Sequence, residues 1–178
     1  DAAGVSSYSV YNHMLLPTVF KSVEADYEHL VNFVQIWDVS CQRQVELQGV
    51  DAARLAQLIT PRDLRKTAAL QGKYAPLCDE RGAVMNDPII IKLAEQRWWL
   101  SIADADIKLW VKGLAYGLGL SVKVFEPDVW PLAVQGPLAE QLMERVFGPV
   151  IREIRFFRGE WLPFRGKEML VMRSGWSK

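Results

Sequence analysis

The sequence has 178 residues, half of them hydrophobic, and its 21 lysines and arginines balance its 21 aspartates and glutamates. A chain of this size and apolar content can bury a sizeable core as one or two compact domains. The balanced charge, with no long run of either sign, argues against nucleic acid or an anionic membrane surface as a partner. The apolar runs are also far shorter than a bilayer span. We therefore expect a soluble protein with a small-molecule partner.

The residues that most often carry metal or hydrolytic chemistry are scarce. Cys41 and Cys78 permit one disulfide at most and give no zinc pattern, so a cytoplasmic location is the default expectation. His13 and His29 are the only histidines, and His29 lies on a predicted helix beside Glu28, where a solvated role is more common than a catalytic one. A hydrolytic triad and a histidine metal site are therefore poor hypotheses. The sequence contains neither a Gly-x-Gly-x-x-Gly motif after a strand nor a Gly-x-x-x-x-Gly-Lys-Ser/Thr motif, the usual phosphate-binding sequences of dinucleotide and nucleotide sites. We expect no metal site and no nucleotide cradle.

The first predicted elements are a helix and then a strand–turn–helix unit. Residues 21–37 place apolar side chains at three- and four-residue steps, which predicts an amphipathic helix. Residues 44–48 alternate polar with apolar side chains until Gly49 interrupts them, and Asp51 is a suitable N-cap for a following helix. That helix would carry Leu55, Leu58 and Ile59.

The same unit recurs later in the chain. Residues 132–135 lead into Gly136-Pro137 and a helix in which Leu142 and Val146 lie on one face, with Pro137 suited to the first turn. Aligning the two units superposes Gln48-Gly49 on Gln135-Gly136. The sequence therefore predicts a weak internal duplication.

A hairpin and two further strands complete the pattern. Residues 89–93 and 98–102 predict a hairpin that turns at 94–97, and Asp104 follows as the cap of another helix. Residues 153–157 and 168–173 are strand-like. Hairpins that alternate with helices favour an α+β fold with mixed or antiparallel sheets over a doubly wound parallel sheet.

Several motifs, in order along the chain, resemble the aminomethyltransferase (glycine-cleavage T-protein) family. Residues 37–40, Trp-Asp-Val-Ser, are similar to the family's Phe-Asp-Val-Ser, and residues 49–53 to its Gly-Pro-Asp-Ala turn. Residues 82–87 resemble its Gly-Gly-Ile-x-Asp-Asp hairpin, 132–137 its Leu-x-x-Gln-Gly-Pro and 173–176 its Arg-Thr-Gly-Tyr. The resemblance implies that residues 1–178 are a folate-binding region with the T-protein-like fold, a fragment without the family's C-terminal part.

Within the family, three stretches resemble the dimethylsulfoniopropionate demethylases. These stretches are residues 8–17, 37–45 and 173–178. T-proteins carry Ser-His-Met at 40–42 and Tyr-Thr-Gly at 176–178, where this chain has Ser-Cys-Gln and Trp-Ser-Lys. The resemblance implies methyl transfer from dimethylsulfoniopropionate, or a related donor, to N5 of tetrahydrofolate.

The resemblance also implies the site residues. Asp87 falls where the family keeps a catalytic, folate-binding aspartate, and Ser101 and Trp176 fall at folate-binding positions. Tyr11 and Trp176 are candidates for the wall that binds the substrate, because an aromatic face attracts a sulfonium cation. The alternatives are a turn carboxylate before Pro88, a surface hydroxyl at Ser101 and a structural aromatic at Trp176.

Two other functions stay open at this point. One is the aminomethyl transfer of glycine cleavage, which requires a lipoyl carrier protein as partner and is disfavoured by Cys41 and Trp176. The other is a folate-binding module of the same family without transferase activity.

Overall fold

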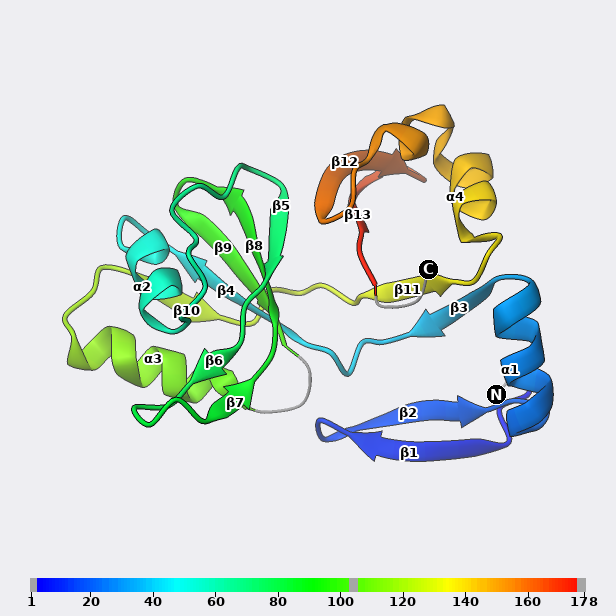
Figure 1. Cartoon of the computed structure of the whole chain (residues 1–178), viewed down its shortest axis with the longest axis horizontal. Coiled ribbons are helices and arrows are strands. Elements are labelled where there is room, and N and C mark those ends of the chain that lie inside the picture. Colours follow the sequence, from blue (N-terminus) through cyan, green and yellow to red (C-terminus); the bar gives the residue numbers. More distant parts are fainter. Residues whose placement is uncertain (1–2, 103–105, 176–178) are drawn as a thin grey trace. The chain divides into compact units, whose positions relative to one another are not determined.

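The computed structural model describes residues 3–102 and 106–175 (Figure 1). The chain divides into two compact units, the first formed by residues 1–41 with 131–178 and the second by residues 42–130. Every strand pairing given below for the described residues is antiparallel. The prediction of an α+β fold with antiparallel sheets is confirmed.

The second unit is built on one antiparallel sheet. Its strands lie in the order β10 (Lys123–Phe125), β4 (Gln44–Gln48), β9 (Arg97–Ser101), β8 (Ile89–Ala94) and β5 (Gln71–Tyr74). The unit also contains helices α2 (Ala52–Leu58) and α3 (Ile107–Gly117) and the small hairpin of β6 (Leu77–Cys78) and β7 (Val84–Asn86). Val45, Leu100 and Ile90 point from the sheet into a core that they share with residues of α2 and α3. Side chains alternate between the two faces of a strand, so the neighbours of these residues in sequence face the other way.

The first unit consists of smaller sheets and two helices. Its elements are the hairpin β1 (Ser7–Tyr11) and β2 (Met14–Val19), helix α1 (Val23–Asn32), the pair β3 (Gln35–Asp38) and β11 (Leu132–Gln135), helix α4 (Ala139–Phe147), a 3-10 helix (Pro149–Glu153) and the hairpin β12 (Arg158–Phe164) and β13 (Lys167–Arg173). Ile151, Ile154 and Leu162 form a small core here. In the part of the chain that the structure describes, no helix is long and apolar enough to cross a membrane.

Two of the predicted elements are wrong in part. The helix expected over residues 21–37 ends at Asn32, and Gln35–Asp38 form a strand instead because their backbone pairs with β11, a partner about a hundred residues away that local periodicity cannot reveal. The strand expected over 153–157 is absent: Pro149–Glu153 form a 3-10 helix, and Phe157 has a φ of +56°. The strand there begins only at Arg158.

The remaining predicted elements are close to those observed. Strand β4 spans residues 44–48 as predicted, β8 and β9 form the predicted hairpin, and β13 covers 168–173. Asp51 stands at the N-cap of α2, but its carboxylate accepts from the backbone N–H of Ser121 at 2.8 Å rather than from a helix amide. Pro137 lies just before the N-cap of α4 instead of in its first turn. Asp104 lies outside the described residues, and α3 begins after Asp106.

The predicted duplication is visible in the geometry of the two strand-to-helix turns. Gly49 follows β4 with a φ of +145°, and Gly136 follows β11 with a φ of +118°. A Cβ atom on Gly49 would lie 2.4 Å from the carbonyl oxygen of Ser121, and one on Gly136 would lie 2.3 Å from that of Phe33. Each turn therefore requires glycine both for its dihedral angles and for the close approach of another backbone segment.

These contacts predict a specific pattern of destabilisation. We expect Gly49→Ala and Gly136→Ala each to lower the free energy of unfolding by about 2 kcal/mol or more, because conformational strain and a collision with a carbonyl add together. Gly82→Ala and Gly148→Ala are matched controls, since both glycines have positive φ but open space around the added methyl group. Urea unfolding measures the difference, and equal losses at all four positions would contradict the role of close approach.

The sheet of the second unit contains an ion pair whose carboxylate is buried and whose arginine is partly exposed. Glu46 is 2% exposed, and its carboxylate accepts from Arg97 Nε at 2.8 Å, Arg97 Nη2 at 3.1 Å and Trp99 Nε1 at 2.8 Å. Burial raises the pKa of Glu46, but the hydrogen bonds from Arg97 and Trp99 and the charges of Arg97 and Lys123 outweigh it, so the pKa lies below its ordinary value of 4.5. The ionised form is thus stabilised by folding.

The lowered pKa predicts how stability depends on pH. The contribution of Glu46 is fully present above about pH 4.5 and is lost as the pH falls through the lower folded-state pKa. We expect Glu46→Gln to cost about 1–3 kcal/mol at neutral pH and to flatten the loss of stability in acid. Denaturant unfolding at several pH values tests this, with Glu80→Gln as the control because the Glu80 side chain is 82% exposed. An unchanged acid slope in Glu46→Gln would contradict the assignment.

Candidate functional site

Asp87 lies on the short connection between β7 and β8. The residue is exposed, while its neighbours Asn86 and Pro88 are buried. The Pro88 carbonyl accepts from Ala75 N at 3.0 Å, and the next residue, Ile89, pairs with Tyr74 of β5. The backbone on both sides is therefore anchored while the carboxylate reaches the surface, an arrangement suited to holding a charged group in a fixed place.

The hydrogen bond recorded for the Asp87 carboxylate comes from a side chain. Tyr74 donates its hydroxyl to Asp87 Oδ2 at 3.3 Å. Burial raises the pKa of Tyr74, and the charge of Asp87 and the hydrogen bond to it raise it further. The sequence alternative of a turn carboxylate held by backbone donors does not describe this contact. Tyr74 orients Oδ2 of Asp87, and no residue of the described ranges donates to Oδ1, which is therefore available as an acceptor.

Ser101 is the last residue of β9. Its Oγ accepts a hydrogen bond of 3.0 Å from Gln44 Nε2, on the neighbouring strand β4. Gln44 is only 7% exposed, and the same amide nitrogen also donates to the Gln42 carbonyl at 3.1 Å. Ser101 is therefore held by a buried partner rather than being a free surface hydroxyl.

The strand register places these residues in one row across the sheet. Gln44 pairs with Ser101, Ser101 with Ile89, and Ile89 with Tyr74. Directly paired residues point to the same face, here the face opposite to Val45, Leu100 and Ile90. We name Gln44, Ser101, Ile89 and Tyr74 the cross-strand row.

The cross-strand row brings two of the predicted site residues into one region. Ser101 belongs to it, and Asp87 is attached to its far end through Tyr74. Ser101 and Tyr74 are two strands apart, roughly 10 Å at the usual strand spacing. The row has polar groups at both ends and an aliphatic side chain, Ile89, between them. Such a surface can hold a flat heterocycle of this size by its edges.

The sequence analysis did not single out Gln44 or Tyr74 as functional. The alternation of side chains along residues 44–48 could have revealed Gln44, since it places Gln44 on the face opposite to the core. Tyr74 has no comparable local signal. Its role follows from pairing with Ile89 and from the position of Asp87, which only the folded chain shows.

The two aromatic candidates are placed differently. Tyr11 is half-buried at the end of β1, in the first unit. It precedes a tight two-residue turn in which Asn12 and His13 have φ values of 51° and 65°, and Asn12 Nδ2 donates to the Cys41 carbonyl at 2.7 Å. Trp176 lies outside the described residues. The substrate wall formed by Tyr11 and Trp176 stays a prediction.

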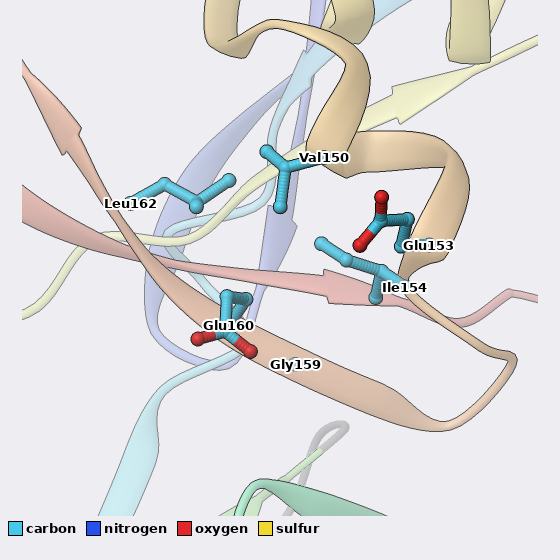
Figure 2. A pocket seen from close by; sticks show the side chains of 6 residues that line it. All are labelled: Val150, Glu153, Ile154, Gly159, Glu160 and Leu162. Carbon is cyan, nitrogen blue, oxygen red and sulfur yellow. The ribbon is translucent and has the colours of Figure 1, made fainter.

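A separate hollow occurs in the first unit (Figure 2). It is lined by Val150, Glu153, Ile154, Gly159, Glu160 and Leu162. Its charged groups are two carboxylates, Glu153 from the 3-10 helix and Glu160 from β12, which would repel an anionic ligand such as a folate tail. None of the predicted site residues in the described part of the chain lines this hollow.

Comparison with known proteins decides the family. A family model described as the GCVT N-terminal domain matches residues 1–178. The chain belongs to this family. The resemblance to aminomethyltransferases noted in the sequence is thereby confirmed.

Individual members of the GCVT family show how the chain relates to longer proteins. The chain is 56% identical over 178 residues to the dimethylsulfoniopropionate demethylase DmdA of Ruegeria pomeroyi, covering all of this chain and 49% of the relative. It is 29% identical over 172 residues to a probable aminomethyltransferase of Pyrococcus horikoshii, covering 91% of this chain and 43% of that protein. The chain thus spans about half the length of the curated relatives it matches.

A solved structure confirms the GCVT fold. The glycine cleavage system aminomethyltransferase T from Bartonella henselae matches with a TM-score of 0.83 at 23% identity, over 98% of this chain and 47% of that chain. The fold predicted from the sequence motifs is therefore the one adopted.

The Tyr74–Asp87 contact predicts a measurable ionisation. We expect Asp87→Asn to lower the pKa of Tyr74, because removing the carboxylate removes both a nearby negative charge and the preferred acceptor of the hydroxyl proton. Ultraviolet titration of the tyrosines measures the shift, and Tyr74→Phe identifies which transition belongs to Tyr74. An identical titration curve in Asp87→Asn and the unaltered protein would contradict the contact.

Proposed function

We propose that the protein containing this chain transfers a methyl group from dimethylsulfoniopropionate, or a related methyl donor, to N5 of tetrahydrofolate. The observation that carries the proposal is the 56% identity to a dimethylsulfoniopropionate demethylase over the whole chain. Identity to the matched aminomethyltransferases is close to 30% over a similar length. A gap of this size favours the demethylase branch.

The cross-strand row fits a pterin ring. A pterin is flat, with hydrogen-bond donors and acceptors along its edges, and the row offers the Ile89 side chain between polar groups at Ser101 and Tyr74. We assign Asp87 the catalytic role of orienting the folate through its free carboxylate oxygen, because charge-assisted hydrogen bonds are the strong and directional ones. Ser101 would hold another edge of the ring.

For this reaction the protein must mainly align the two reactants, and a strong acid or base is less important. The new bond forms between the methyl carbon and N5, the carbon–sulfur bond breaks with its electron pair staying on sulfur, and the leaving group is a neutral thioether. The proton of N5 is then lost to solvent or to a nearby base. The sulfonium must be desolvated and aimed, a task that we assign to the aromatic faces of Tyr11 and Trp176.

Aminomethyl transfer in glycine cleavage is the second candidate, because several matched relatives are aminomethyltransferases. It would require a lipoyl carrier protein as partner, whereas methyl transfer from a sulfonium needs only the two small molecules. For either reaction we propose a cytoplasmic location, in keeping with Cys41 and Cys78, which are not joined in a disulfide in the described structure.

The test uses the full-length protein. Tetrahydrofolate is titrated by calorimetry without oxygen, and 5-methyltetrahydrofolate is assayed after dimethylsulfoniopropionate is added. We expect Asp87→Ala to weaken folate binding by about 10- to 100-fold, as loss of a hydrogen bond to a charged group does. Trp176→Ala should reduce methyl transfer. Asp63→Asn is the control, since Asp63 pairs with Arg65 at the surface of the same unit.

The outcomes separate the candidates. Binding with methyl transfer supports the demethylase. Folate binding without product, followed by activity with an aminomethylated lipoyl carrier, would favour glycine cleavage. Binding with neither activity would indicate a folate-binding module, and no binding would overturn the proposal.

A further inference from the structure

Gln44 is a buried polar residue, and the nitrogen of its side-chain amide donates two hydrogen bonds. Its Nε2 atom donates to the Gln42 carbonyl at 3.1 Å and to Ser101 Oγ at 3.0 Å. A backbone carbonyl accepts hydrogen bonds and cannot donate them. The Gln42 carbonyl therefore fixes which end of the Gln44 amide faces Ser101, and that end is the nitrogen.

This orientation of the Gln44 amide determines whether the Ser101 hydroxyl donates or accepts the hydrogen bond between them. A hydroxyl group has one hydrogen to donate and lone pairs that accept. Since the amide nitrogen of Gln44 can only donate, Ser101 Oγ must accept from it, and the Ser101 hydrogen must point elsewhere. In the described part of the chain, the hydrogen bond recorded for Ser101 Oγ is the one that it accepts. Ser101 is thereby prepared as a donor.

We propose that Gln44 is a positioning residue that makes Ser101 a hydrogen-bond donor toward an acceptor atom of the folate ring. The inference rests on the proposed function and deepens it, because it gives the cross-strand row a polarity. The Ser101 end donates to a ring carbonyl or unprotonated ring nitrogen, and the Asp87 end accepts from ring N–H groups. A flat heterocycle with the opposite arrangement of donors and acceptors would leave a buried polar group unpaired.

A double-mutant cycle in the full-length protein tests the coupling. The variants are Gln44→Met, Ser101→Ala and the two together, and the readout is the dissociation constant of tetrahydrofolate from anaerobic calorimetry. We expect each single change to weaken binding by roughly three- to tenfold, the effect of one hydrogen bond, and the double change to weaken it no further. If the fold-loss of affinity in the double variant equals the product of the two single fold-losses, Gln44 and Ser101 act independently, which overturns the inference.

Gln44→Glu adds a test of polarity. A carboxylate there accepts from Ser101 and occupies its hydrogen, so folate binding should fall as it does in Ser101→Ala although the hydroxyl is still present. Gln57→Met is the matched control: the Gln57 amide nitrogen also donates two hydrogen bonds, here to the backbone carbonyls of Thr60 and Arg62, but Gln57 lies on α2. We expect it to lower the unfolding temperature without changing folate affinity.

The results separate a failure of the Gln44–Ser101 inference from a failure of the proposed function. Full folate affinity in Gln44→Glu would overturn the inference while leaving the proposed function intact. Absence of folate binding by the unaltered full-length protein would overturn the proposed function and the inference with it. A loss of affinity in Gln57→Met equal to that in Gln44→Met would show that general destabilisation, and not the polarity of Ser101, controls binding.

Discussion

Antiparallel pairing in register is the constraint on which the second unit depends. Along β4, β9 and β8, side chains alternate between the helix-covered core and the opposite face, so Val45, Leu100 and Ile90 can be fully buried together. The same alternation requires Gln44, Ser101 and Ile89 to share the other face. The position of the candidate site therefore follows from core formation: once the apolar side chains are buried on one face, the cross-strand row must lie on the other.

The strand-to-helix turns fix where helices α2 and α4 begin. In both copies the glycine carbonyl accepts from the first helical residue, Gly49 from Ala52 and Gly136 from Ala139, each at 3.0 Å. In both, the absence of a side chain lets a carbonyl from elsewhere in the same unit approach the turn. The backbone geometry shared by the two copies accounts for the recurrence of the Gln-Gly pair without any catalytic role for it.

The sequence predicted the elements with strong local signals and missed those set by distant contacts. The alternation of residues 44–48 and the Gln-Gly turns depend on neighbours in the chain, and both were predicted correctly. The prediction of helix at β3 is wrong because Ile36 and Trp37 continue the helical pattern of apolar residues, whereas their backbone pairs with β11. Asp87 and Ser101 came from a family resemblance. Their connection through Ile89 and Tyr74, and the part played by Gln44, required the pairing of four strands, which no local pattern contains.

The ion pair of the buried Glu46 carboxylate with Arg97 also favours one strand register. Glu46 pairs directly with Trp99, two residues along from the Gln44–Ser101 pair and on the same face. A one-residue slip of β4 against β9 would turn Glu46 toward the apolar core and remove both Arg97 and Trp99 as donors, leaving an uncompensated buried charge. The correct register alone satisfies this carboxylate. By penalising the slip, Glu46 holds Gln44 opposite Ser101, and the polarity of the candidate site follows from a residue that does not belong to it.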